Sequence, residues 1–202
     1  MFIVMEGTEG CGKSTQAKKL VSNFEKLSKT VQLVREPGTT VLGESIRTFF
    51  KDVETLDPMS ELFLFAAARA QLVNDVINPS LALGNIVICD RFFPSTIAYQ
   101  SYGRGIDMEL VKHCNDLATS KLIPDLIIWL KIPIEMGLGR KNEDEKNFYE
   151  RESLSFHKKV YDGYLLQERD SNNWFVVDGT ASVEAISKII WDKIIIELAK
   201  FG

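Results

Sequence analysis

The feature that most constrains the fold is a glycine-rich segment close to the N-terminus. Residues 7–14 read Gly-Thr-Glu-Gly-Cys-Gly-Lys-Ser, which is the pattern G-x-x-x-x-G-K-S. An apolar run, Phe2 to Met5, precedes this segment, and apolar residues at helical spacing follow Lys13. Glycines let successive backbone N–H groups turn inward around phosphate oxygens, and the next helix adds its positive end. The segment therefore predicts a strand, a phosphate-binding loop and a helix, in this order.

Four side chains predict that the chain binds phosphate and a metal ion. Two lie in this loop, and two follow another apolar run. Lys13 is expected to reach the β- and γ-phosphates of a nucleotide, and the Ser14 hydroxyl to ligate Mg²⁺. Asp90 and Arg91 directly follow the apolar run Ile86 to Cys89. An Asp at a strand end can hold the water shell of Mg²⁺, and an Arg can bind a phosphate. The alternative for Asp90 is a simple strand-end cap.

Apolar runs recur along the chain with helical patterns between them. The runs are Phe2 to Met5, Val31 to Val34, Ile86 to Cys89, Leu126 to Leu130 and Trp174 to Val177. They show little alternation, which is typical of strands buried on both faces. Strands that alternate with helices predict an α/β fold with a parallel sheet. We therefore expect a P-loop NTPase fold with a five-stranded parallel sheet and helices on both faces, in a single domain over residues 1–202.

One segment differs in composition from the rest. The run Arg140 to Lys146 contains no apolar residue, so it cannot be core. We interpret it as a solvated loop between two helices and as the centre of a lid insertion at approximately residues 136–152. A lid that closes over phosphates excludes water, which otherwise competes as the acceptor.

Composition excludes several classes of function. The formal net charge is −4, which argues against a nucleic-acid partner and against binding to an anionic membrane. No apolar run is long enough to span a bilayer, and the first residues lack the basic region of a secretory signal. The cysteines Cys11, Cys89 and Cys114 have unrelated spacings, which favours free thiols and a cytoplasmic location.

The class of P-loop protein can be narrowed further. A GTPase needs a guanine-reading Asn-Lys-x-Asp, and no Asn-Lys pair occurs in the sequence. Motor and transporter ATPases usually need a larger domain or arms that contact partners. A chain of 202 residues with a late hydrophilic lid favours a kinase of small phosphate acceptors.

At this point the sequence resembles the thymidylate kinases over nearly its whole length. The residues that carry the resemblance are Glu6 to Thr15, Arg35 to Thr39, Gly43-Glu44 with Ile46-Arg47, Leu62 to Arg69, Asp90 to Gln100, and Gly103 to Gly105. The resemblance implies that the chain phosphorylates dTMP to dTDP with ATP and Mg²⁺, in dTTP biosynthesis. It also implies a homodimer, for which the apolar helices around Phe63 and Val111 offer a face.

The resemblance also implies the site residues. ATP would be bound by Gly7, Thr8, Glu9, Gly10, Cys11, Gly12, Lys13, Ser14, Thr15 and Arg140. The substrate dTMP would be bound by Glu9, Arg47, Phe65, Arg69, Arg91, Ser95, Thr96, Tyr99 and Gln100. The catalytic residues would be Lys13, Asp90, Arg91 and Arg140, and the metal-binding residues Ser14 and Asp90.

Individual roles follow from the same resemblance. Phe65 would stack on the thymine ring, and Arg69 would donate to its carbonyl. Thr96 and Gln100 would read the thymine edge. Tyr99 and Glu9 would lie near the deoxyribose, and Arg47 and Arg91 would hold the 5′-phosphate, with Arg35 an open candidate nearby. From the residues alone, core packing is the alternative to a ligand contact for both Phe65 and Tyr99. Burial of Arg69 without a partner is costly, which favours a polar ligand.

The lid departs from the pattern of bacterial relatives with lid arginines. Those relatives often carry an Asp-Arg pair where this chain has Asn147-Phe148. Arg140 is the first candidate for contact with the transferred phosphoryl group. Which of Lys141, Lys146 and Arg151 assists it stays open.

Three other functions remain to be weighed. A deoxynucleoside kinase would need a carboxylate base near the acceptor hydroxyl, and Glu36 is the candidate. A kinase of another nucleoside monophosphate would differ at Phe65, Arg69, Thr96 and Gln100. A nucleotide-dependent binding module would bind ATP without forming a diphosphate.

Overall fold

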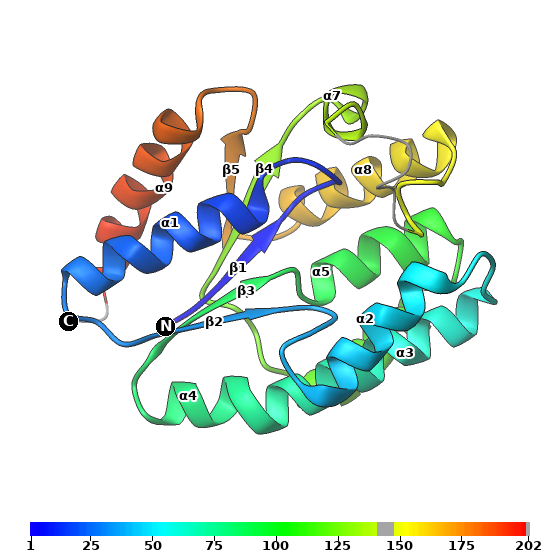
Figure 1. Ribbon diagram of the computed structural model, residues 1–202, viewed down its shortest axis with the longest axis horizontal. Coiled ribbons are helices and arrows are strands. Elements are labelled where there is room, and N and C mark those ends of the chain that lie inside the picture. Colours follow the sequence, from blue (N-terminus) through cyan, green and yellow to red (C-terminus); the bar gives the residue numbers. More distant parts are fainter. Residues whose placement is uncertain (141–147, 201–202) are drawn as a thin grey trace.

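The computed structural model describes residues 1–140 and 148–200, and its centre is a parallel sheet (Figure 1). The strands are β1 Phe2–Glu6, β2 Val31–Arg35, β3 Ile86–Asp90, β4 Leu126–Lys131 and β5 Trp174–Asp178. Their order in the sheet is β2-β3-β1-β4-β5, and every pair is parallel. The predicted five-stranded parallel sheet and α/β fold are therefore confirmed.

Helices cover both faces of the sheet, as predicted (Figure 1). The helices are α1 Lys13–Lys26, α2 Val41–Asp52, α3 Pro58–Leu72, α4 Asn78–Ala82, α5 Phe93–Thr96, α6 Met108–Thr119, α7 Ile134–Leu138, α8 Leu154–Arg169 and α9 Val183–Leu198. Two π-helical segments, η1 Val73–Ile77 and η2 Ile97–Gly103, continue α3 and α5. The strands β2 and β3 lie on one side of β1, and β4 and β5 lie on the other. Where the strand order reverses in this way, a crevice forms at the carboxyl ends of the strands, here β1, β3 and β4.

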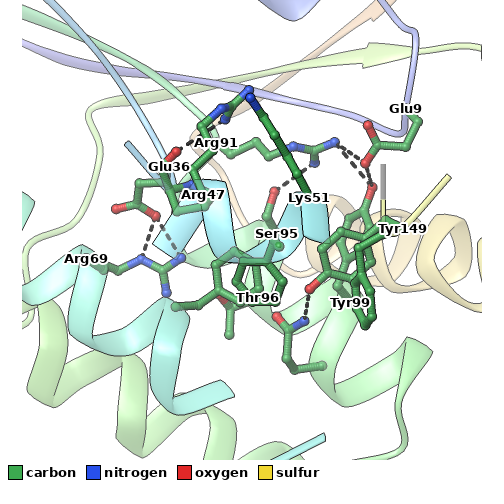
Figure 2. Close-up of a pocket in the computed structure, with 15 residues that line it drawn as sticks. Glu9, Glu36, Arg47, Lys51, Arg69, Arg91, Ser95, Thr96, Tyr99 and Tyr149 are labelled. Carbon is green, nitrogen blue, oxygen red and sulfur yellow. Dashed lines mark hydrogen bonds and ion pairs between the residues drawn. The ribbon is translucent and has the colours of Figure 1, made fainter. Parts of the chain in front are cut away.

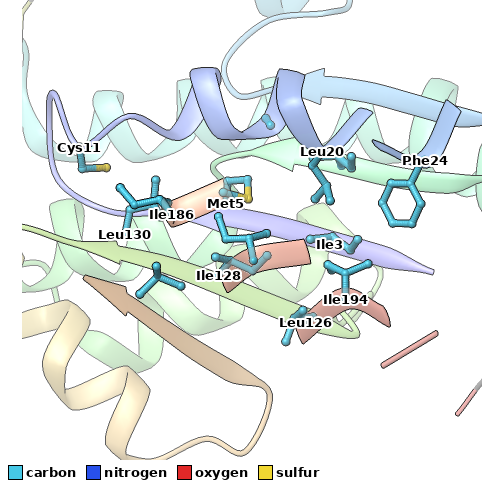
Figure 3. Packing of buried hydrophobic residues seen from close by; sticks show 14 of the residues in the cluster. Ile3, Met5, Cys11, Leu20, Phe24, Leu126, Ile128, Leu130, Ile186 and Ile194 are labelled. Atoms are coloured by element: carbon cyan, nitrogen blue, oxygen red, sulfur yellow. The ribbon is translucent and has the colours of Figure 1, made fainter. Parts of the chain in front are cut away.

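The core on the α1 and α9 face shows why the strand runs are apolar throughout. Side chains of alternate β1 residues, Ile3 and Met5, pack here with Leu20 of α1 and Ile194 of α9, all nearly or fully buried (Figure 3). The intervening β1 residues, Phe2 and Val4, pack into a second core on the opposite face. Because both faces of β1 are covered, the strand shows no alternation of polar and apolar residues.

Local signals fix where the helices near the site begin. The Asp57 carboxylate accepts from the backbone N–H groups of Met59 and Ser60, both at 3.0 Å, and Pro58 follows at the first helical position. This is the N-cap and proline arrangement that the sequence predicts for α3. The cap sets the register of α3, which presents Phe65 and Arg69 to the crevice.

The glycines of the phosphate-binding loop allow a close approach to α7. Gly10 has φ +68°, and a Cβ on it would lie 2.1 Å from the carbonyl oxygen of Gly137. A Cβ on Gly137 would in turn lie 2.2 Å from the carbonyl oxygen of Glu9. Only glycine fits at both positions, so the loop lies directly against the helix that leads into the expected lid.

The structure bears on the expected dimer face and on the expected lid. Val111 is fully buried, so it cannot belong to a dimer face, whereas Phe63 is 55% exposed. Lys141, Lys146 and Asn147, which the sequence places in the lid, lie outside the described residues. Among the described residues, no helix combines the length and apolar character needed to cross a bilayer.

Candidate active site

A cavity of about 180 Å³ lies at the carboxyl edge of the sheet. Its walls include every residue that the sequence assigns to the substrate: Glu9, Arg47, Phe65, Arg69, Arg91, Ser95, Thr96, Tyr99 and Gln100. Its other lining residues are Glu36, Pro37, Phe50, Lys51, Phe148 and Tyr149. The chain therefore brings residues from six separate segments together at one place.

The phosphate-binding loop forms the donor side of the site. The Lys13 ammonium group is buried and donates to the carbonyl oxygens of Gly7 and Thr8, each at 3.0 Å. It also lies 3.4 Å from the Cys11 sulfur. The positive charge is thus held inside the loop, next to the backbone N–H groups of the first turn of α1.

Ser14 and Asp90 meet although they are 76 positions apart in the sequence. The Ser14 hydroxyl donates to Asp90 Oδ2, because α1 starts beside the carboxyl end of β3. A hydroxyl and a carboxylate are the hard oxygen ligands that Mg²⁺ takes while keeping waters and substrate phosphates as its other ligands. The pair therefore fits a Mg²⁺ site. Among the described residues, no cluster of three or more His, Cys, Asp or Glu side chains forms an alternative metal site.

The Arg91 side chain extends from the end of β3 to Glu9 of the phosphate-binding loop (Figure 2). Its guanidinium forms an ion pair with Glu9 at 2.7 Å and donates to Gly7 O at 3.0 Å and to Ser95 Oγ at 3.1 Å. Tyr99 contributes a further hydrogen bond at 3.3 Å. Arg91 has φ +72°, a left-handed conformation that turns the chain sharply at the end of β3 and aims the side chain at the phosphate-binding loop.

A buried carboxylate that sequence reasoning missed fixes this turn. Glu6 is fully buried and accepts from Phe92 N at 2.9 Å, Ser95 Oγ at 2.7 Å and Tyr164 Oη at 2.8 Å. Burial raises the pKa of Glu6, against the opposing field of Arg91. The available signal was Glu6 itself, a single acid in an otherwise apolar strand, because an acid is rarely buried without partners.

The other end of the cavity holds Arg69 and Glu36 (Figure 2). Arg69 Nε and Nη2 lie 2.8 and 2.7 Å from Glu36 Oε2, and Nη1 donates to Asn115 Oδ1 at 2.7 Å. These protein groups offset the cost of burying Arg69, so its burial does not by itself favour a ligand, and its contact with the base stays a prediction. Burial raises the pKa of Glu36 to about 7, although Arg69 opposes the shift.

Aromatic rings form the wall beside this ion pair. Phe65 stacks on Phe50 with centroids 4.8 Å apart and planes 16° from parallel. Tyr149 lies 6.1 Å from Phe65 and meets Tyr99 edge to face at 4.9 Å. Phe50, Phe148 and Tyr149 were not predicted as site residues. Phe50 looks like an ordinary core residue in sequence, whereas Phe148 and Tyr149 fall within the expected lid at approximately residues 136–152.

The remaining predicted cations occupy different surroundings. Arg47 is half-buried and donates to Pro37 O at 3.2 Å, so it reaches the cavity. Arg35 instead lies outside the cavity lining and binds Glu44 at 2.9 and 3.0 Å. Arg140 is exposed and donates to Gly10 O at 2.7 Å, on the phosphate-binding loop. Arg151 lies 3.4 Å from the Lys51 carbonyl oxygen.

Comparison with known protein families gives one description for nearly the whole chain. The family model described as thymidylate kinase matches residues 5–190. A thymidylate kinase of Trichlorobacter lovleyi is 42% identical over 98% of this chain and 99% of the relative. One from Dehalococcoides mccartyi is also 42% identical, over 96% of this chain and 95% of the relative.

The solved structures agree with the sequence comparison. A crystal structure of thymidylate kinase from Ehrlichia chaffeensis superposes with a TM-score of 0.80 at 32% identity. It covers 96% of this chain and 98% of its own. The similarity therefore includes the sheet, both helical layers and the edge at which the cavity lies.

Proposed function

The chain belongs to the thymidylate kinase family and phosphorylates dTMP to dTDP with ATP as the donor, and we propose that the residues of the cavity and the phosphate-binding loop carry this reaction. The observation that supports the proposal most strongly is spatial. Residues of the P-loop, the turn after β3 and helix α3 converge on one cavity that joins phosphate-binding groups to an aromatic wall.

On the donor side, the loop backbone and Lys13 bind the β- and γ-phosphates of ATP. Arg140, already in contact with the loop through Gly10, binds the transferred group from the lid side. Ser14 and Asp90 would hold Mg²⁺, directly or through its waters. The ion would supply neutralisation of the negative charge on the phosphates of ATP.

On the acceptor side, Arg91 and Arg47 hold the 5′-phosphate of dTMP. Two negatively charged groups must approach for transfer, and the planar guanidinium forks cancel their repulsion. The attacking phosphate oxygen is already anionic, so no strong protein base is required. Catalysis then consists of positioning and charge neutralisation.

The base and sugar occupy the far part of the cavity. Phe65 offers one ring face to thymine because Phe50 covers the other. Arg69 donates to the base carbonyl, and Thr96 and Gln100 contact the edge of the base. Glu9 and Tyr99, hydrogen-bonded to each other at 2.9 Å, lie at the deoxyribose.

The deoxynucleoside kinase alternative loses support from the family match and from the contacts of Glu36. The matching family model describes kinases of thymidylate, whose anionic phosphate needs no protein base. The Oε2 atom of Glu36 is held by two nitrogens of Arg69, away from Glu9 (Figure 2).

Three further features belong to the same proposal. We infer that residues 1–202 act as one domain with a lid at approximately 136–152, and that the enzyme acts in the cytoplasm. We also infer a homodimer that covers exposed apolar side chains such as Phe63, 55% exposed, and Leu117, 70% exposed. Light scattering on the purified chain tests the dimer.

A panel of nucleoside monophosphates tests the substrate assignment. With ATP and Mg²⁺, dTMP should give its diphosphate with the highest kcat/KM, ahead of dUMP and dCMP, and thymidine should not react. Faster turnover of dCMP than dTMP would show that the base assignment is wrong. Chelation of Mg²⁺ with EDTA should abolish turnover, and activity that survives it would contradict the metal site.

A further inference from the structure

A buried polar cluster lies behind the base end of the cavity, and none of the roles described above uses it. Its centre is Glu61 of α3, which is fully buried. Glu61 accepts from Gln100 Nε2 at 2.6 Å, from Tyr149 Oη at 2.8 Å and from Arg104 Nε at 3.0 Å. Arg104 also pairs with Glu152 at 2.6 Å.

The cluster determines which end of the Gln100 amide faces Glu61. An ionised carboxylate only accepts hydrogen bonds, so the NH₂ end must face it. The reversed amide would place two acceptor oxygens 2.6 Å apart, which is repulsive. Gln100 is 1% exposed and lines the cavity, and among the described residues its Oε1 atom has no hydrogen-bond partner. The atom left for a ligand is therefore an acceptor.

The ion pair with Arg104 favours the ionised form of Glu61, which imposes this orientation. Burial raises the pKa of Glu61, and the Arg104 guanidinium opposes that shift. The ring faces of Phe148, Tyr149 and Phe156 pack around Arg104 at 5.3, 5.9 and 4.6 Å. The cation is thus fixed beside the carboxylate.

We propose that Glu61 is a positioning residue for base specificity: it holds the Gln100 amide so that the cavity presents an acceptor to the N3 position of the base. This inference rests on the proposed function, in which Gln100 contacts the base edge. Thymine and uracil carry an N3–H donor and satisfy the acceptor. Cytosine carries a lone pair at N3, and the locked amide cannot turn over to donate to it. One source of the rejection of cytosine is thus a repulsive contact at N3 that Glu61 maintains.

The test compares three substrates with the full-length enzyme. In Glu61→Gln the neighbour of Gln100 can donate as well as accept, so the Gln100 amide is free to rotate. The ratio of kcat/KM for dTMP to that for dCMP should fall about tenfold, because one unpaired buried polar contact is relieved. The ratio for dTMP to dUMP should stay within about twofold, since both bases present the same N3–H. A pocket that merely loosened would change both ratios.

Two matched variants separate orientation from general damage to the cluster. Glu152→Gln removes a partner of Arg104, 2.6 Å away in the same cluster, but leaves the Glu61–Gln100 bond, so the ratio of dTMP to dCMP should be preserved. In Gln100→Met the acceptor is gone, and adding Glu61→Gln should change the ratio no further. If Glu61→Gln proves unfolded by circular dichroism, Glu61→Asp keeps the charge beside Arg104, draws the carboxylate back from the amide and should shift the ratio in the same direction.

The outcomes distinguish this inference from the function beneath it. If the unaltered enzyme does not prefer dTMP to dCMP, the proposed function fails. If it does, and Glu61→Gln and Glu61→Asp lower all three kcat/KM values in parallel, Glu61 only supports the fold and the inference is overturned. Relaxation by Glu152→Gln as strongly as by Glu61→Gln would also overturn it.

Discussion

The phosphate-binding loop and the base end of the cavity hold their ligands with different parts of the chain. The loop uses a short contiguous segment in which backbone groups and Lys13 point inward. The base end uses side chains from separate elements, and it contains a buried ion pair, Glu36 with Arg69, and a second buried acid, Glu61. Phosphate presents the same charge from every direction, whereas a base edge has to be read by donors and acceptors in fixed orientations.

This difference implies different consequences of mutation. Removing a group from the loop removes charge that acts on the transferring phosphoryl group, so the loss falls on kcat. Removing a group from the base end leaves that chemistry in place and weakens binding of dTMP, so the loss falls on KM. Arg91 contacts both regions, through Gly7 on one side and Tyr99 on the other.

The largest effect is expected at Lys13. Lys13→Ala removes the buried ammonium group from the loop, and kcat should fall on the order of 10³-fold, with dTMP binding changed little. Steady-state kinetics with calorimetric binding of dTMP measures both. Loss of dTMP affinity by a similar factor would show that the two regions are not separable in this way.

Arg91→Ala should have the next largest effect. Because Arg91 contacts both the loop and the base end, both kcat and KM should change. We expect kcat/KM for dTMP to fall on the order of 10²-fold, with contributions from both kcat and KM. Arg91→Lys keeps the charge but not the planar fork and should recover only part of the loss. Near-normal turnover by Arg91→Ala would remove this residue from the mechanism.

The same contrast explains what the sequence could predict. The loop, Asp90 and the strands were predictable because their signals lie within short segments, and the parallel sheet follows from the alternation of strands and helices. The strand order β2-β3-β1-β4-β5 was not predicted. Every residue carried over to the substrate site lines one cavity, and the roles of these residues stay predictions. The partners of these residues were not predictable. Arg69 meets Glu36 across 33 positions, Gln100 meets Glu61 across 39, and Tyr149 meets Glu61 across 88.

Long-range pairing also explains the missed residues. Glu6 and Glu61 stand in apolar elements, and periodicity gives no reason why an acid is tolerated there. Their burial is acceptable only because distant donors converge on them once the fold has formed. A single buried acid in a strand or helix is therefore a signal that a polar cluster exists, but not of its members.

At the base end, Phe65→Ala should raise the KM for dTMP about 10-fold to 100-fold and leave kcat within about threefold. The change removes the ring proposed to stack on thymine, which acts by binding rather than on the phosphoryl group. Phe49→Ala is the matched control, since Phe49 is 44% exposed and lies outside the cavity lining. A fall in kcat alone for Phe65→Ala would contradict the division between the regions.

The smallest expected effect is a pH dependence of stability at the base end. Burial raises the pKa of Glu36 from 4.5 to about 7, so the folded chain binds this proton more tightly than the unfolded chain. The resulting stabilisation is fully present below pH 4.5 and is lost as the pH rises through about 7. Glu36→Gln cannot titrate. Its deficit in unfolding free energy should therefore shrink between pH 5 and pH 8, by on the order of 2 kcal/mol in urea titrations.

Glu44→Gln provides the control of opposite sign for this measurement. The hydrogen bond from Arg35 lowers the pKa of Glu44 below 4.5, so its stabilisation is present above that pH and is lost only on further acidification. Its deficit should stay constant between pH 5 and pH 8. If the deficit of Glu36→Gln instead stayed constant or grew with pH, Arg69 would outweigh burial at Glu36. The base end would then contain an ordinary ion pair. It would differ from the phosphate-binding loop only in the fixed orientation of its side chains.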